Sequence, residues 1–219
     1  PAYGCTDNLR TQLNGTLANK VKSVIGLDAL KEEVNSNTVL VFFESPANPS
    51  LKIVDIEELT RIVKNINPRA LVGFDNTFAT SKGQRPLKHG VDISMVGLTK
   101  GMSGSGDVIG AVLTAKRSIA RKLKEKREAV SAPLDSLDAF KVAAYGLPHL
   151  PERLAVQEAN AFRYVDFLKE QGDIVTSVVY PGDPANPDHE VALRQMDNFG
   201  YMVYFDLGSI EMANAFIDL

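Results

Sequence analysis

Lys100 and Asp75 are the two residues of this sequence whose types and positions best suit chemistry. Each follows a predicted strand, Lys100 after residues 91–97 and Asp75 after residues 70–74. Taken alone, a lysine at the end of a buried strand more often extends into solvent. A carboxylate at the end of a separate strand alters that balance, because an amine in a pocket beside an acid suits an imine-forming cofactor. The acid would pair with a pyridinium nitrogen, so that the ring can act as an electron sink.

The residues around Lys100 offer groups for a phosphate. Thr99 carries a hydroxyl that can donate to a phosphate oxygen, and the glycine-rich run 101–106 allows close backbone approach to a ligand. A nucleotide-binding domain that uses the 101–106 run is another possible interpretation. It is disfavoured, because no G-K-[ST] closes the loop and no G-x-G-x-x-G opens a helix after the first strand.

Alternating apolar runs and amphipathic segments set these residues in an α/β fold. Strands are predicted at 38–43, 70–74, 91–97, 108–114 and 200–207, and helices at 26–35, 55–65, 116–130 and 151–171, with Asp55 capping the second. Strands that are apolar on both faces indicate a parallel or mixed sheet with cover on both sides. Because ligands bind beyond the carboxyl ends of such strands, we expect Glu44, Asp75 and Lys100 to converge.

The proline-rich stretch 181–187 marks a change of organisation. We expect a large domain over 1–150, a connecting helix region over 151–180 and the start of a small C-terminal domain over 181–219. The chain begins at Pro1 without an initiator Met and stops inside a predicted amphipathic helix, so we expect it to be part of something longer.

Composition excludes several classes of protein. Hydrophobic residues make up 44% and charged residues 23% of 219 residues, as in ordinary globular proteins. A net charge of -3 gives no reason to expect nucleic acid or an anionic membrane as partner, and a small molecule is the better expectation. No apolar stretch approaches the ~20 residues of a membrane span, and no signal peptide is evident. A single cysteine, Cys5, favours the cytoplasm and is more often a small buried hydrophobe than a reactive thiol.

Two further clusters carry little functional signal. The three histidines are far apart and lack metal-ligand spacing, so no metal site is expected. The basic segment 116–127 is interrupted by Glu125, lacks aromatic residues, and favours a solvated or subunit-facing helix over nucleic-acid binding.

Several motifs, taken together and in order, resemble the Cys/Met-metabolism family of pyridoxal-phosphate enzymes. They are Glu44-Ser45-Pro46-Ala47-Asn48-Pro49, Asp75-Asn76-Thr77-Phe78-Ala79-Thr80, Gln84-Arg85-Pro86-Leu87, Thr99-Lys100, Tyr180-Pro181-Gly182 and the segment 189–196. The resemblance implies a large domain of the aspartate-aminotransferase type (fold type I) with a mostly parallel sheet, followed by the start of a smaller α/β domain. It also implies pyridoxal 5'-phosphate as cofactor, a sulfur amino acid as substrate and a homotetramer.

The resemblance assigns a role to each matching residue. It implies that Lys100 forms the imine with the cofactor, Asp75 pairs with the pyridine nitrogen, and Asn48 donates to the phenolic oxygen. Tyr3, in Tyr-Gly-Cys-Thr, is similar to the family tyrosine that stacks on the ring and assists the leaving group. The Tyr-Gly-Cys-Thr tetrapeptide is most similar to the one in methionine gamma-lyase.

The sequence also departs from the family pattern. Gly97 stands where a serine usually contacts the phosphate, Gly101 replaces the aromatic residue after the lysine, and Tyr145 replaces an arginine. Family subunits extend beyond both ends of this chain, and the arginine that binds the substrate carboxylate is expected there. Gamma-elimination is the leading expectation, gamma-replacement on an O-acylhomoserine is the alternative, and a non-catalytic relative is the rival from another class.

Overall fold

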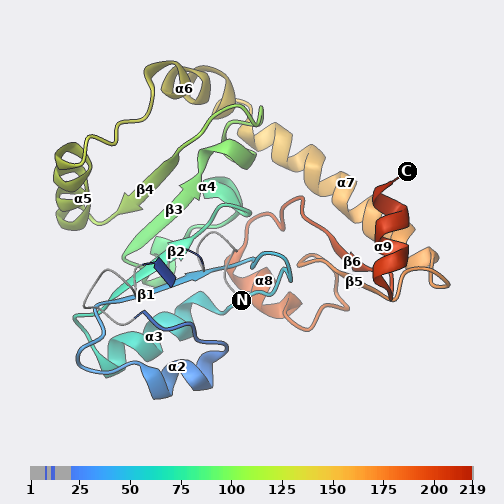
Figure 1. The fold of residues 1–219 in the computed structure, drawn as a ribbon, viewed down its shortest axis with the longest axis horizontal. Coiled ribbons are helices and arrows are strands. Elements are labelled where there is room, and N and C mark those ends of the chain that lie inside the picture. The colour runs from blue at the N-terminus through green and yellow to red at the C-terminus, as the bar shows by residue number, and fades with distance from the viewer. Residues whose placement is uncertain (1–7, 9–10, 13–20, 219) are drawn as a thin grey trace.

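The computed structural model describes residue 8, residues 11–12 and residues 21–218 (Figure 1). The elements before the middle of the chain are α2 (Leu27–Glu33), β1 (Leu40–Glu44), α3 (Ile56–Ile66), β2 (Leu71–Asp75), α4 (Thr80–Gly83), the 3₁₀ turn η1 (Pro86–His89), β3 (Ile93–Gly97) and the π-helical turn η2 (Leu98–Met102). After these come β4 (Ala111–Ala115), α5 (Arg117–Ala129), α6 (Ser136–Lys141), a second π-helical turn η3 (Val142–Gly146), α7 (Leu150–Glu170), β5 (Ser177–Val179), α8 (His189–Gln195), β6 (Tyr204–Asp206) and α9 (Ile210–Ile217).

The first four strands form one mixed sheet in the order β1-β2-β3-β4. The β1–β2 and β2–β3 pairs are parallel, whereas β4 runs antiparallel to β3. Parallel strands place their carboxyl ends on the same edge of the sheet. The mostly parallel α/β fold predicted from the sequence is therefore confirmed, and its last strand is reversed.

Helices α2 and α3 pack on one face of this sheet. Asp55 caps α3 as predicted, because its side chain accepts a hydrogen bond of 2.9 Å from the Glu58 N–H. The buried residues of α3 pack with Phe74 of β2, whose ring meets that of Phe43 edge-on at 4.8 Å. This apolar layer fixes the strands whose ends carry the candidate site.

The opposite face of the sheet is open within residues 21–218. Leu40, Phe42 and Leu113 on that face remain 49%, 44% and 49% exposed. Leu40 and Phe42 pack over Gly73, where an added Cβ would lie 2.7 Å from Phe42 Cδ2. Cover on both sides was expected, and the described residues provide it on one side.

The C-terminal third is organised around the long helix α7, which runs from beside η3 to the antiparallel pair β5–β6 (Figure 1). The strand predicted at 200–207 is shorter than expected, because Gly200 adopts a positive φ of 83° and turns the chain before β6. Helix α9 confirms the amphipathic helix expected near the end of the chain. Among the described residues, no helix is long and apolar enough to cross a membrane.

Candidate active site

The strand ends bring the predicted polar residues to one edge of the sheet. Glu44 is the last residue of β1 and lies opposite Asp75, the last residue of β2. Asp75 in turn lies opposite Met95 of β3, and that strand ends two residues later at Gly97. Lys100 follows within η2. The edge predicted from the sequence is therefore the edge at which these residues lie.

Thr77 links the end of β2 to the end of β3. Its hydroxyl donates to Asp75 Oδ1 at 2.6 Å and accepts from the Gly97 N–H at 2.9 Å. Its own backbone N–H donates to the same Oδ1 at 2.9 Å. The side chain thus continues the parallel ladder one step beyond β2, and it holds one oxygen of the Asp75 carboxylate in place. Within the described residues, Oδ2 carries no hydrogen bond and stays available to a ligand.

Lys100 lies at a break in the turn that follows β3. Its backbone (φ -93°, ψ -125°) is not helical, although the carbonyls on either side of this break are held. The Ser103 N–H donates to Leu98 O and the Gly104 N–H donates to Lys100 O, each at 3.0 Å. The lysine side chain is exposed, and among the described residues its ammonium has no hydrogen-bond or ion-pair partner. Hydrogen bonds therefore hold the backbone of this turn, while within the described residues the side-chain nitrogen has no partner.

Thr99 and Asn48 flank this edge from two different turns. Thr99 is half-buried in η2, and its carbonyl accepts a 3.4 Å hydrogen bond from the Ser103 hydroxyl. Asn48 is half-buried in the loop after β1, where its backbone N–H donates to Glu44 Oε1 at 3.1 Å. The Asn48 amide is unbonded among the described residues, so both side chains keep polar atoms for a ligand.

The remaining residue proposed for the site, Tyr3, lies outside the described residues, as does Cys5. Its stacking role stays a prediction.

Sequence reasoning missed Arg153, which reaches the lysine turn from α7. One Arg153 terminal nitrogen donates to Gly101 O at 2.8 Å, to Gly146 O at 3.0 Å and to Met102 O at 3.4 Å. A guanidinium satisfies several carbonyls at once because its donors are fixed in a plane. No local signal marks it, because Arg153 lies 52 residues beyond Gly101.

Gly104 of the 101–106 loop has a packing reason that does not require a phosphate. Gly104 has a φ of +74°, and a Cβ there would lie 2.5 Å from Arg153 Cζ. Gly146 faces the same loop, where a Cβ would lie 2.5 Å from Met102 O. The loop lies against the Arg153 guanidinium, which accounts for the glycine at 104 and further disfavours a nucleotide-binding loop.

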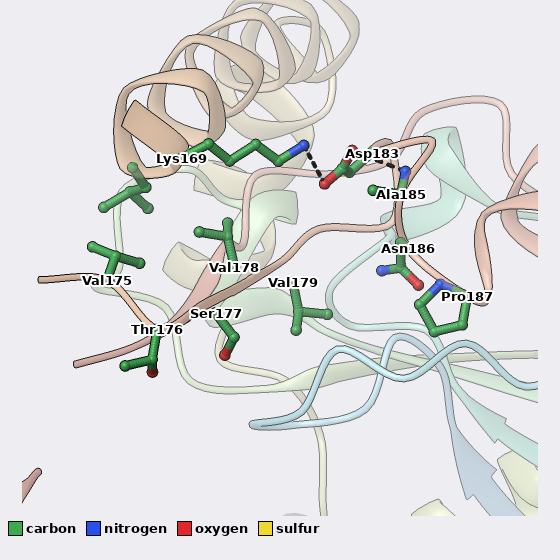
Figure 2. Close-up of a pocket in the computed structure, with 11 residues that line it drawn as sticks. Lys169, Val175, Thr176, Ser177, Val178, Val179, Asp183, Ala185, Asn186 and Pro187 are labelled. Atoms are coloured by element: carbon green, nitrogen blue, oxygen red, sulfur yellow. Dashed lines mark hydrogen bonds and ion pairs between the residues drawn. The ribbon is translucent and has the colours of Figure 1, made fainter. Parts of the chain in front are cut away.

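A separate cavity of about 300 Å³ lies between the end of α7, β5 and the loop 183–187 (Figure 2). Lys169 and Asp183 form a 2.6 Å ion pair at its rim. Burial acts to raise the pKa of Asp183, but the hydrogen bonds from Lys169 and the Ala185 N–H outweigh it and lower the pKa. None of the predicted site residues lines this cavity, so we assign the site to the strand ends and not to this hollow.

No group of three or more metal-ligating side chains is found in the described part of the chain. The polar atoms at the strand ends are instead an amine, a carboxylate, an amide and a hydroxyl. That donor set suits an organic cofactor with an aldehyde, a ring nitrogen and a phosphate.

Comparison with known sequences gives a consistent group of relatives. The model of the family described as "Cys/Met metabolism PLP-dependent enzyme" matches residues 1–219. L-methionine gamma-lyase of Fusobacterium nucleatum subsp. polymorphum is 37% identical over 209 residues, which are 94% of this chain and 52% of that protein. Cystathionine beta-lyase of Lactococcus lactis subsp. cremoris (strain MG1363) is 36% identical over 193 residues, covering 88% of this chain and 50% of that protein. The chain thus spans about half the length of the curated relatives it matches.

Solved structures show the same fold. Cystathionine gamma synthase from Xanthomonas oryzae pv. oryzae, in complex with cystathionine, superposes with a TM-score of 0.91 at 31% identity, covering 99% of this chain and 56% of that one. Cystathionine gamma-lyase from Lactobacillus plantarum, complexed with L-serine, gives a TM-score of 0.87 at 30% identity, covering 94% and 54%.

Proposed function

Because the chain belongs to the Cys/Met metabolism family of PLP-dependent enzymes, we propose that it carries the cofactor lysine of a C–S lyase that acts on cystathionine, methionine or homocysteine by gamma-elimination. The observation that supports this most directly is the arrangement at one sheet edge. Thr77 holds one oxygen of Asp75 and also binds the Gly97 N–H at the end of β3. Lys100 follows Gly97 by three residues, and its side-chain nitrogen has no partner in the part of the chain that the structure describes.

The residues present fit pyridoxal phosphate. Asp75 Oδ2, unbonded among the described residues, would accept from the protonated ring nitrogen, and Asn48 would donate its amide to the phenolic oxygen. Thr99 would donate its hydroxyl to the phosphate. Gly97 offers no side chain to that phosphate, so Thr99 would carry more of the phosphate binding. When bound, the cofactor supplies an electron sink conjugated to the substrate Cα.

The amine of Lys100 would then move protons. Its side-chain nitrogen would take the proton from the substrate Cα and pass a proton onward to help expel the γ-thiol. Asp75 would hold the proton on the ring nitrogen. Tyr3 would assist the departing group. The products of elimination are a 2-oxo acid, ammonia and a thiol.

A second candidate is gamma-replacement on an O-acylhomoserine. It is supported by the match to the cystathionine gamma synthase structure, which has the higher TM-score of the two structures compared above. Both reactions would use Lys100 and Asp75 in the same way and differ in whether a thiol enters after the γ-substituent leaves. Cytoplasmic localisation and a homotetramer stay predictions, to be checked by cell fractionation and light scattering.

Two measurements test the proposal. The protein is incubated with pyridoxal phosphate and reduced with borohydride, and the modified peptide is identified by mass spectrometry. We expect it to contain Lys100, and an Asp75→Asn variant to be modified at the same lysine while losing activity. A modified peptide that excludes Lys100 would refute the assignment.

Product analysis separates the two candidate reactions. With cystathionine, methionine and O-acetylhomoserine supplied in turn, elimination releases ammonia and a 2-oxo acid. Replacement gives a new thioether or homocysteine only when an O-acylhomoserine and a thiol or sulfide are both present. If Lys100 is modified but neither the elimination products nor the replacement product forms, a non-catalytic relative is favoured.

A further inference from the structure

The space beside Gly101 is filled from elsewhere in the chain. Gly101 follows the cofactor lysine at a position where the family resemblance leads one to expect an aromatic side chain. A Cβ built at Gly101 would lie 2.7 Å from Thr80 Cγ2, 3.5 Å from Tyr201 Cε1 and 3.6 Å from Tyr201 Oη. Tyr201 and Thr80 therefore occupy the volume that a side chain on residue 101 would need, and the aromatic ring arrives from a segment 100 residues later in the sequence.

The backbone that carries Tyr201 is held on both sides. Gly200 has a φ of +83°, and its carbonyl accepts a 2.9 Å hydrogen bond from the buried Tyr180 hydroxyl. The Gly200 N–H donates to Asn198 Oδ1 at 2.9 Å, and the Phe199 N–H donates to Glu158 Oε1 of α7 at 2.6 Å. A glycine is needed at 200 because a side chain disfavours this left-handed conformation. The turn thereby directs Tyr201 at Gly101.

Residues 196–197 bind residues 83–85, which follow Asp75 in the chain. The Asp197 N–H donates to Gly83 O at 2.7 Å, and Met196 forms an isolated bridge with Gln84. The Asp197 carboxylate forms a 2.8 Å ion pair with Arg85. Tyr201 also lines a narrow crevice with Pro46 and Phe78, which belong to the loops after β1 and β2. Tyr201 therefore lies beside the loops after the first two strands as well as the turn after the third.

Tyr201 and Arg153 hold Gly101 from different directions. Arg153 binds the Gly101 carbonyl at 2.8 Å, while the phenol oxygen of Tyr201 faces the Gly101 N–H. Burial raises the pKa of the Tyr201 phenol, and the Gly101 N–H and the Arg153 guanidinium act in the opposite direction. The phenol is therefore neutral at physiological pH and acts through packing and its polar oxygen.

We propose that Tyr201 is a positioning residue for Lys100, supplying from the C-terminal part of the chain the aromatic support that Gly101 lacks. The inference rests on the proposed function of Lys100. Tyr201 touches the residue next to the lysine and not the reacting atoms, so it acts by fixing the direction from which the amine approaches the cofactor and the substrate Cα. A displacement of about 1 Å in such a group costs about a hundredfold in rate.

The test compares Tyr201→Phe, which keeps the ring, with Tyr201→Ala, which removes it. Phe205→Ala is the matched control, because this half-buried ring contacts Tyr164 and Phe216 and does not reach Gly101. Each protein is saturated with pyridoxal phosphate. Three quantities are measured: the rate of borohydride modification at Lys100, the pH at which the visible absorption band of the lysine-bound cofactor titrates, and kcat separately from KM.

We expect Tyr201→Ala to lower the modification rate at Lys100 and kcat by about tenfold or more, with a displaced titration of the absorption band. Tyr201→Phe should restore most of each loss, and Phe205→Ala should change none of the three. Equal behaviour of Tyr201→Ala and wild type would overturn the positioning role, and so would equal losses in Tyr201→Ala and Phe205→Ala. If wild type is not modified at Lys100, the proposed function itself fails, which is a different and separately visible result.

Discussion

Replacing Thr77 by valine removes one hydroxyl that joins the ends of β2 and β3 and leaves the shape of the side chain almost unchanged. The lost interactions are a 2.6 Å hydrogen bond donated to the Asp75 carboxylate and a 2.9 Å hydrogen bond accepted from the Gly97 N–H. A hydrogen bond to a charged group contributes about 1.5–3 kcal/mol, and leaving a buried donor unsatisfied costs about 1–3 kcal/mol. Since both partners are only half-buried, we expect a combined loss near the lower ends, about 2–4 kcal/mol.

Urea unfolding measures this loss. With a slope of about 2–3 kcal/mol per molar urea, the midpoint should fall by about 1 M, without a change of slope. Thr114→Val on the exposed strand β4 is the control, and it should change the free energy of unfolding by no more than about 0.5 kcal/mol. Thr77→Ser keeps the hydroxyl and should recover most of the stability.

Cofactor binding gives the second measurement on the same variants. The Asp75 carboxylate keeps only the backbone N–H of residue 77 as a donor in Thr77→Val, so its orientation toward the ring nitrogen is less restricted. We expect weaker binding of pyridoxal phosphate in Thr77→Val than in Thr77→Ser. If Thr77→Val unfolds at the same urea concentration as Thr114→Val, the hydroxyl does not support this edge of the sheet and the reasoning fails.

Three further outcomes are expected. Gly97→Ser should lower the free energy of unfolding by about 1–3 kcal/mol. The reason is that its Cβ would lie 3.2 Å from two atoms of the Thr77 side chain, which two hydrogen bonds hold in place. Adding Thr77→Ser should recover part of this loss, as measured by urea unfolding. Gly101→Ala should reduce borohydride modification at the cofactor lysine, because its methyl would overlap the threonine methyl 2.7 Å away. The pKa of Asp183 is lowered below its ordinary value of about 3.9, so its ion pair contributes stability above that pH and loses it as the pH falls through the folded-state pKa. Lys169→Met should therefore lower the free energy of unfolding by about 1 kcal/mol at pH 7. On acidification the variant should lose less further stability than wild type does. Urea unfolding of both proteins at pH 7 and below pH 4 measures these losses.

Local sequence patterns predicted the part of the site that depends on strand ends. The apolar runs before Asp75 and Lys100, and the capping position of Asp55, are properties of short segments, and the structure confirms each within a few residues. Parallel pairing then places the two strand ends on one edge. The reversed direction of β4 was not predicted, because an apolar run of five or six residues does not show the direction in which it pairs.

Contacts between distant segments account for what the sequence did not predict. Arg153 and Tyr201 meet Gly101 across 52 and 100 residues, and no periodicity or motif marks either of them. The strand expected from residue 200 was wrong at its start for the same reason, since Gly200 turns away from extended geometry so that Tyr201 can reach the lysine turn. A glycine where a large side chain was expected is itself a signal, because the vacated volume in a close-packed protein has to be filled by another group.

The two glycines that set this chain apart from its family pattern bear on whether it is an active enzyme. Gly97 lacks a side chain for the phosphate, but its N–H is bound by Thr77, which also orients Asp75. Gly101 lacks an aromatic ring, but the Tyr201 ring lies beside it, with Cε1 3.5 Å from the position of an added Cβ. Random loss of function would leave such positions with voids or unpaired groups, because nothing would select for compensation. Here both glycines are matched by a contact with another residue beside the candidate site, which supports the proposed divergent enzyme over a non-catalytic relative.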